Sequence, residues 1–487
     1  MPEAWPRFDL LASPLDGTNL IEASAGTGKT YAIAGLFLRL LLEKHLSPSE
    51  ILVVTCTVAA TEELRDRIRG KIRTALDVLN GAGATEPFIE DLVGGIGDRK
   101  DARARLREAL RSFDEVPIFT IHSFCQRMLS ENAFESGSPF DTELLPDERE
   151  LREEIVRDFW RRHFYEAPPE FVHYARGRCR GPASFLELLR AAPLRPDSRI
   201  VPDTPPAALT GLEAVRTAVA GLRESWPKSR AGVEAALRAE ALNRVQYGRP
   251  ERLLSAMDAF LARPWAALPL SKELLKFSPG ALAKAAKKGH VSPTHRFFDR
   301  FRDFEAAAQV LIAEMDGQIR FLRCDLFRYV RQELALRKRR RNLRSYDDLL
   351  GDLRKALVSE GGGALSGAIR RKYRAALIDE FQDTDPVQFA IFESVFGQGG
   401  TTLFLIGDPK QALYSFRGAD LFAYIRAASY VERRYTLAEN WRSEPELIRA
   451  INTLFSRPKH PFLYEAIPFE KAQAAVREAP VLTFCGR

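Results

Sequence analysis

The chain has 487 residues, of which 45% are hydrophobic and 28% are charged. At roughly 150 residues per domain, this length predicts about three domains with full hydrophobic cores. The 72 basic residues outnumber the 65 acidic ones and give a net charge of +7, which permits a polyanionic partner without requiring one. The longest apolar run near the start, residues 32–42, is broken by Arg39 and is too short to cross a bilayer.

The first twenty residues and the cysteines exclude further classes. Residues 1–20 carry acidic groups and lack the basic-then-apolar pattern of an export signal, so we expect a cytoplasmic protein without a membrane partner. The five cysteines have no paired spacing, which argues against a disulfide framework, a zinc site or an iron–sulfur cluster. We expect them to be buried thiols.

Short apolar runs alternate with helical stretches in the first 145 residues. The runs are Asn19–Ala23, Ile51–Thr55 and Pro117–Thr120, and a helical pattern begins at Lys29 after the first of them. Strands that alternate with helices predict a parallel sheet with helices on both faces.

The strand signal disappears between residues 146 and 345. This stretch is rich in Ala, Arg, Leu and Glu, with Pro-rich breaks, and predicts an all-helical domain. The sheet pattern resumes at Ala375–Asp379 and Leu403–Gly407. The sequence therefore predicts one α/β domain interrupted by a large helical insertion.

Two basic clusters lie within the helical stretch, at Lys284–Lys288 and Arg337–Arg341. Either cluster alone is more typical of a solvated helix face than of a surface that contacts phosphates. Both interpretations stay open at this point.

The segment Ala23–Thr30 fits the P-loop pattern, with alanine in place of the first glycine. Gly26 and Gly28 allow the loop to bend so that backbone N–H groups point at a phosphate chain, and the next helix presents its positive end. We expect Lys29 to reach the β- and γ-phosphates and the Thr30 hydroxyl to bind Mg²⁺; the alternative is a glycine-rich turn. The predicted nucleotide-binding residues of this segment are Ala23, Ser24, Ala25, Gly26, Thr27, Gly28, Lys29 and Thr30.

A carboxylate pair follows the expected strand at residues 375–378. We assign Asp379 to Mg²⁺ coordination and Glu380 to polarising the hydrolytic water. An acidic pair after a strand is by itself more often a helix cap. Its position after a P-loop and before Phe381–Thr384 favours the catalytic interpretation.

Polar and aromatic residues follow the third strand of this set. Gln411 can hydrogen-bond the γ-phosphate or its attacking water. Tyr414 and Phe416 are either core residues or a platform for single-stranded bases. Further on, Trp441 can stack and Arg442 can neutralise charge on the transferring phosphoryl group.

Together these motifs resemble the UvrD-type superfamily 1 helicases. The matching segments are Ile21–Thr30, Thr120–Met128, Ile378–Pro386 and Leu405–Gln411. The residues within these motifs, together with Phe416–Asp420 and Asn440–Ser443, are most similar to the RecB family of exodeoxyribonuclease V beta subunits. The resemblance covers nearly the whole chain and is weakest between about residues 165 and 320. It implies a RecA-like fold and an ATP-dependent motor that moves 3′→5′ on DNA at broken duplex ends in recombinational repair.

The resemblance also implies roles and partners. Gln411 and Arg442 would contact ATP, with Trp441 beside the adenine, and the partners would be gamma (RecC-like) and alpha (RecD-like) subunits. The residues implied to face single-stranded DNA are Thr120, His122, Ser123, Phe124, Tyr414 and Phe416, with Thr55 and Thr57 bonding phosphates. Cys56 stands where the family usually has a phenylalanine. Because cysteine cannot stack on a base, we expect weaker DNA binding at this position.

The family pattern also sets the expected domain boundaries. We expect the first motor domain at residues 1–145 and 346–440, the helical insertion at 146–345, and the start of a second motor domain at 441–487. Family members continue with the rest of that domain and, in the RecB family, a nuclease, so we expect this chain alone to bind Mg-ATP and single-stranded DNA with little turnover. Two alternatives remain: a non-catalytic fragment that binds DNA or a subunit, and an AddA-type helicase–nuclease motor.

Overall fold

The computed structural model describes residues 5–83, 86–137, 142–191, 199–206, 208–397, 400–412, 420–458, 460–462 and 464–475. It divides the chain into two compact units, one formed by residues 1–144 and 344–487 and the other by residues 145–343. We call them the sheet unit and the helical unit.

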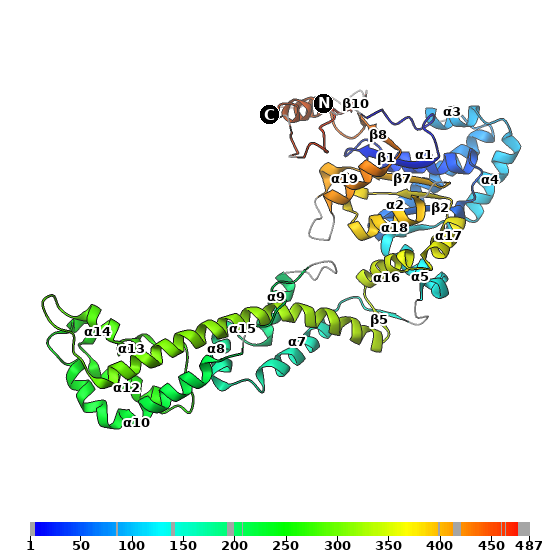
Figure 1. Ribbon diagram of the computed structural model, residues 1–487. Helices are drawn as coiled ribbons and strands as arrows, with labels where there is room; N and C mark the ends of the chain where they lie inside the picture. The colour runs from blue at the N-terminus through cyan, green and yellow to red at the C-terminus, as the bar shows by residue number, and fades with distance from the viewer. Residues whose placement is uncertain are drawn as a thin grey trace, which may run out of the picture. The chain divides into compact units, whose positions relative to one another are not determined.

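The sheet unit is built around six parallel strands in the order β3-β2-β6-β7-β1-β8 (Figure 1). The order places β7 between β1, which precedes the P-loop, and β6, which precedes the acidic pair. The strands are β1 (Gly17–Ala23), β2 (Ile51–Thr55), β3 (Ile118–Thr120), β6 (Ala375–Ile378), β7 (Thr402–Gly407) and β8 (Arg433–Leu437).

Alternate residues of each buried strand enter different hydrophobic cores. In β2, for example, Ile51 and Val53 pack into one core, whereas Leu52 and Val54 pack into the other. Successive side chains of a strand point to opposite faces, so a sheet covered on both sides needs apolar residues at every position. The predicted parallel α/β sheet with helices on both faces is therefore confirmed.

Each face has its own set of helices. The helices of the first core are α1 (Lys29–Leu42), α2 (Val58–Leu79), α3 (Pro87–Gly94) and α4 (Arg99–Arg111). Those of the second are α5 (Ile121–Glu131), α16 (Tyr346–Val358), α17 (Gly362–Lys372), α18 (Pro386–Phe396) and α19 (Leu421–Tyr430).

Short elements complete the sheet unit. They are α6 (Ala133–Ser136), α20 (Pro445–Phe455), β4 (Glu143–Leu144), β5 (Leu343–Arg344), β9 (Glu439–Asn440), β10 (Gln473–Ala474), η1 (Pro48–Glu50), η2 (Phe113–Glu115), η3 (Phe381–Asp383) and η4 (Pro409–Gln411). Within residues 441–487 the described part is α20, β10 and their connections, and these belong to the same compact unit as the sheet.

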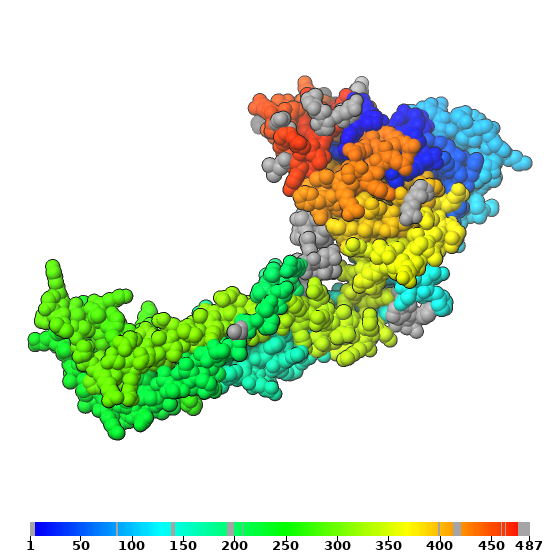
Figure 2. Space-filling model, in the orientation of Figure 1, coloured from blue at the N-terminus to red at the C-terminus, as the bar shows by residue number. Residues whose placement is uncertain are grey.

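The helical unit packs around one long helix, α15 (Arg296–Arg340), which contacts α7, α8, α9, α10 and α14 (Figures 1 and 2). Its own core is rich in phenylalanine and leucine. The other helices are α7 (Arg149–Phe164), α8 (Pro169–Arg178), α9 (Pro182–Ala191), α10 (Gly211–Leu237), α11 (Arg244–Tyr247), α12 (Pro250–Leu261), α13 (Lys272–Leu275) and α14 (Pro279–Ala285).

Charge is unevenly distributed between the two units. Residues 145–343 contain 37 basic and 25 acidic residues, a net charge of +12, whereas the remainder of the chain contains 35 basic and 40 acidic residues, a net charge of −5. The modest overall charge therefore conceals a strongly basic helical unit.

The two basic clusters of this unit differ in their surroundings. Arg337 pairs with Asp158 at 2.7 Å and with Glu154 at 3.0 Å, and Lys338 pairs with Glu148 at 2.7 Å, so these cations join the end of α15 to α7 and its N-cap residue Glu148. In contrast, the lysines of the Lys284–Lys288 cluster are exposed to solvent. The Lys284–Lys288 cluster therefore keeps an open basic surface, whereas Arg337 and Lys338 of the other cluster are engaged in ion pairs.

Candidate nucleotide-binding site

The P-loop joins the end of β1 to the start of α1 and bends at two glycines. Gly26 and Gly28 have φ values of 80° and 90°, a left-handed region that favours glycine. A Cβ on Gly26 would lie 2.7 Å from the Cβ of Arg442, so no side chain fits there. Gly28 is the N-cap of α1, and no side chain of the described residues caps the helix, so its first N–H groups are available to an anion.

Lys29 and Glu380 meet across the edge of the sheet. The Lys29 Nζ lies 2.7 Å from the Oε2 of Glu380, although β7 separates the strands that precede the two residues. Glu380 has a φ of 50°, and the Gln382 amide donates a 2.5 Å hydrogen bond to the same carboxylate oxygen. The P-loop and the acidic pair therefore form one site.

Asp379 is a buried carboxylate with an unused oxygen. Its side chain is 8% exposed, and its Oδ1 has no hydrogen-bond partner among the residues that the structure describes. Burial, followed by the neighbouring charge of Glu380, raises the pKa of Asp379 to about 7.

These residues fit a magnesium ion. Magnesium is held in nucleotide sites by one or two protein oxygens together with phosphates and water, and an unpaired buried carboxylate oxygen is a suitable ligand. The half-buried Thr30 follows Lys29 in the first turn of α1 and supplies a hydroxyl. Within the described ranges, His, Cys, Asp and Glu form no group of three that could hold a metal by themselves.

Gln411 is held by a buried polar network at the end of β7. Its amide donates a 2.7 Å hydrogen bond to Asp408 Oδ2, and the backbone N–H of Asp408 donates one of 2.8 Å to Gln382 Oε1. Gln382 also bonds Glu380, so it links the acidic pair to the segment that carries Gln411. This bridge connects the expected catalytic carboxylate to the expected γ-phosphate sensor.

A buried cation completes the network. The Lys410 Nζ lies 2.8 Å from Asp408 Oδ1 and forms an ion pair with Glu22 on β1. Burial lowers the pKa of Lys410, but the attraction of Glu22 and Asp408 outweighs burial and raises it. Sequence reasoning missed Glu22, Gln382, Asp408 and Lys410; the available signal was a glutamate inside the otherwise apolar strand at residues 20–23.

The segment 440–443 is hydrogen-bonded to the P-loop. The Asn440 amide donates to the carbonyl of Ala25, and the backbone N–H of Trp441 donates to that of Gly26, both at 2.8 Å. Asn440 Oδ1 accepts from the N–H of Arg442 at 2.9 Å, while the guanidinium of Arg442 is exposed. The structure thus places Arg442 and the half-exposed Trp441 in a segment beside the P-loop.

The residues expected to face DNA fall into different environments. Thr120 and Ser123 share a 2.9 Å hydroxyl contact at the start of α5, and the ring of the half-buried His122 lies 5.4 Å from that of Tyr346. Thr57 is exposed and caps α2 by accepting from the N–H of Ala60. These groups are accessible or partly accessible.

Two of these expectations need correction. Phe124 is fully buried and stacks on Phe392 in the second core, so its ring does not face solvent. Thr55 is 2% exposed because it ends a completely buried strand. Tyr414 and Phe416 lie outside the described residues.

Cys56 also differs from the expectation of buried thiols. It is exposed, and its Sγ lies 3.9 Å from the carbonyl oxygen of Glu380. Burial of the sulfur atom and the nearby carboxylates, Asp383 first, raise its pKa to about 12. Cys125 and Cys179 are buried, and Cys324 is partly buried.

A parallel sheet, a glycine-bent loop before a helix, and a carboxylate pair within reach of the loop lysine define a P-loop nucleoside triphosphatase fold. Residues 9–431 match the UvrD/REP helicase N-terminal domain. The chain belongs to this helicase family.

Similar proteins are RecB subunits of the RecBCD enzyme. The Escherichia coli subunit is 38% identical over 98% of this chain, and the Haemophilus influenzae subunit is 33% identical over 96% of it. The Mycobacterium tuberculosis subunit is 31% identical over 92%. The chain spans 41%, 42% and 30% of these relatives, respectively. No helix among the described residues is long and apolar enough to cross a membrane.

Proposed function

We propose that this chain is the ATP-binding part of a RecB-type DNA helicase, a 3′→5′ translocase that acts on broken duplex ends in recombinational repair. The observation that carries the proposal is the 2.7 Å contact between Lys29 and Glu380 beside the unpaired oxygen of Asp379. Likeness to RecB subunits supports the substrate, the gamma (RecC-like) and alpha (RecD-like) partner subunits, and a cytoplasmic location.

The site residues would have different roles in ATP hydrolysis. The P-loop N–H groups and Lys29 would bind the phosphate chain, and Asp379 and Thr30 would hold Mg²⁺, which supplies charge neutralisation on the phosphates. Glu380 would take the proton from the attacking water. Lys29 contacts this carboxylate directly, so phosphate binding would draw the lysine away from Glu380 and leave the carboxylate free to act as a base.

Gln411 and Arg442 approach the site from other segments. Gln411 lies at the end of the network that begins at Glu380, so a change at the γ-phosphate can alter the position of both residues together. Arg442 has an exposed guanidinium on a backbone that is hydrogen-bonded to the P-loop, a suitable position for a cation that neutralises the transferring phosphoryl group.

The test is DNA-stimulated ATP hydrolysis by the full gene product with single-stranded DNA. Lys29→Ala should abolish hydrolysis, whereas Lys355→Ala, at an exposed lysine of the same unit, should leave it unchanged. Hydrolysis that survives Lys29→Ala would contradict the proposal. Unwinding of substrates with a 3′ or a 5′ single-stranded end would test the direction.

A second candidate function is DNA binding by the helical unit independent of ATP. The net charge of +12 on residues 145–343 and the exposed Lys284–Lys288 cluster favour it. If this unit alone accounts for DNA affinity, the affinity should persist in Lys29→Ala and Glu380→Gln, and ATP should not change it.

A further inference from the structure

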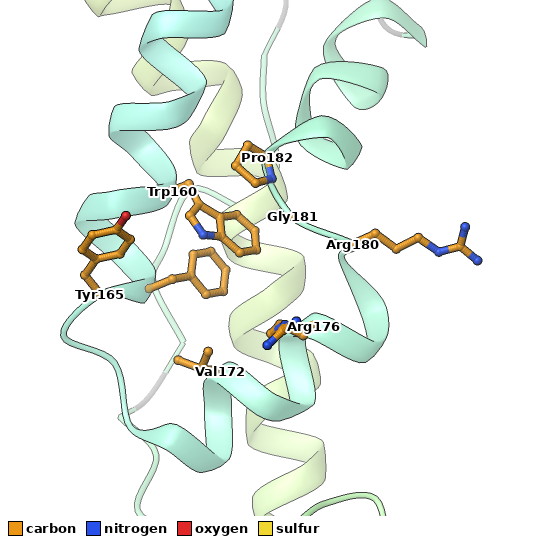
Figure 3. A pocket seen from close by; sticks show the side chains of 8 residues that line it. Trp160, Tyr165, Val172, Arg176, Arg180, Gly181 and Pro182 are labelled. Carbon is orange, nitrogen blue, oxygen red and sulfur yellow. The ribbon is translucent and has the colours of Figure 1, made fainter.

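The helical unit contains a solvent-accessible cavity that the motor mechanism does not use. Its volume is about 540 Å³, and it lies between the end of α7, α8 and the turn that leads into α9 (Figure 3). The lining residues are Trp160, Phe164, Tyr165, Val172, Arg176, Arg180, Gly181 and Pro182. This volume falls within the range of pockets that bind small ligands, about 300–1,000 Å³.

One wall of the cavity is a fixed aromatic surface. The rings of Trp160 and Phe164 stack with centroids 3.9 Å apart and an angle of 15° between their planes, and Phe164 stacks in turn on Phe171. The edge of Phe185 also contacts the Trp160 ring. Because these neighbours fix the indole, a flat ligand can stack on it without first ordering a mobile side chain.

The other wall carries positive charge from two arginines. Arg176 and Arg180 are exposed, and neither forms an ion pair with any residue that the structure describes. In Figure 3 Arg176 lies below the Trp160 indole, and Arg180 extends away from the other lining side chains toward solvent.

The turn between α8 and α9 leaves the rim open. Gly181 has a φ of 109°, and no atom of the described residues lies within 4 Å of the position that its Cβ would take. At Gly181 this edge of the cavity is therefore formed by backbone alone, and no described side chain fills the space beside it.

We propose that this cavity binds one nucleotide unit of single-stranded DNA, with the base stacked on Trp160 and a phosphate contacted by Arg176 and Arg180. An aromatic face beside guanidinium groups matches a nucleotide, which joins a flat ring to an anion. A base inside a duplex is stacked and paired, so only an unpaired strand can insert one. The proposal rests on the proposed function in taking DNA as the polymer, and adds a contact outside the ATP-dependent unit.

Fluorescence anisotropy of the full chain, without nucleotide, tests the site. The probes are a labelled oligothymidylate and an oligomer of the same length made of abasic units. Trp160→Leu should weaken binding of the oligothymidylate roughly tenfold and leave the abasic oligomer unchanged, whereas Trp160→Phe should retain most of the affinity. Thermal melting of each variant checks that it is folded.

Arg176→Gln with Arg180→Gln should weaken binding of both probes. The matched control is Arg244→Gln with Arg249→Gln, which removes the same charge from exposed positions of the same unit. An equal loss in the control pair would show that only total charge matters and would overturn the proposal. Unchanged affinity in the Arg176/Arg180 pair would overturn it as well.

Cross-linking tests the cavity directly, even if the sheet unit contributes most of the DNA affinity. An oligonucleotide that carries 5-iododeoxyuridine should, on irradiation, attach to the peptide that contains Trp160 and Tyr165, and mass spectrometry identifies it. Absence of this cross-link would overturn the proposal and point to an acidic protein partner instead. Lys29→Ala should leave the cross-link intact, so failure of the ATPase assignment and failure of this site are distinguishable.

Discussion

Lys410 forms an ion pair with Glu22 although 388 positions separate them in the chain, and both side chains are largely buried. The contact joins the turn after β7 to the last part of β1, immediately before the P-loop. Asp408 shares the same ammonium group at 2.8 Å and accepts the hydrogen bond of Gln411. The position of Gln411 therefore depends on a cation that does not itself touch the P-loop lysine.

Replacing Lys410 by methionine should destabilise the protein strongly. Removal of the cation leaves Glu22 and Asp408 as buried carboxylates, and breaking a buried pair in this way costs about 3–5 kcal/mol. Urea unfolding measures the change. Glu22→Gln in the Lys410→Met background should recover part of the loss, because it removes one unpaired charge.

The control for this prediction is an exposed ion pair. Lys44 lies 2.6 Å from Asp16, and both side chains are more than a third exposed. Lys44→Met should cost about 1 kcal/mol or less, since exposed pairs contribute little. Similar losses at Lys44 and Lys410 would refute the idea that burial makes the second pair important.

Asp379 should make stability fall as the pH rises. Its pKa is about 7 in the folded protein against 3.8 ordinarily, so between these values the unfolded chain releases a proton that the folded protein keeps. The free energy of unfolding therefore decreases over about pH 4 to 7, by an amount on the order of 4 kcal/mol.

Asp379→Asn removes this dependence and should be more stable than the parent chain at pH 8, with the difference shrinking toward pH 5. Urea unfolding across this range measures it. Asp91→Asn, at an exposed carboxyl, controls for the change of residue type. A constant difference between Asp379→Asn and the parent chain at all pH values would show that the carboxyl does not keep its proton.

Local sequence order was sufficient to predict the P-loop and the acidic pair. Each is a short segment at the end of an apolar strand, and parallel strands bring such ends to one edge of the sheet. The contact between Lys29 and Glu380 follows from that rule, even with β7 between their strands.

The remaining parts of the site depend on long-range pairing or on helix phase. Nothing local to Glu22 reveals that Lys410 will neutralise it. The burial of Phe124 did have a signal, because Ile121, Phe124, Cys125 and Met128 follow the spacing of one buried helix face. This spacing predicts a buried ring, whereas the resemblance to a DNA-contacting motif implies an accessible one.

Glu380→Gln should separate ATP binding from hydrolysis. The amide keeps the shape of the side chain but cannot accept the proton of the attacking water, so hydrolysis should fall about 10²–10⁴-fold. Because Lys29 loses its charged partner, ATP affinity should be equal to or higher than that of the parent chain. Binding of a fluorescent ATP analogue and single-turnover hydrolysis by the full gene product measure the two effects.

Two further variants serve as controls for this measurement. Glu360→Gln, at an exposed glutamate, should change neither quantity, and Lys29→Ala should lose binding. Hydrolysis at the parental rate in Glu380→Gln would assign the base to another residue.

Gly26→Ala tests whether the P-loop and the segment 440–443 act as one unit. The new methyl group would lie 2.7 Å from the Cβ of Arg442 and 3.1 Å from Oδ1 of Asn440, in addition to the strain of a positive φ. The segment must therefore shift away, which breaks the hydrogen bond from the Trp441 N–H to the Gly26 carbonyl. ATP affinity should fall at least tenfold, and Trp441 should become more accessible to a fluorescence quencher.

Gly137→Ala separates the effect of the steric clash with Arg442 from the effect of the backbone strain at a positive φ. Gly137 also has a positive φ, 62°, but its Cβ would meet no atom of the described residues within 4 Å. This variant should lose about 1 kcal/mol of stability and keep its ATP affinity, because only the backbone conformation is penalised. If Gly26→Ala behaves in the same way, the segment 440–443 is not coupled to the P-loop, and the placement of Arg442 near the phosphates loses its support.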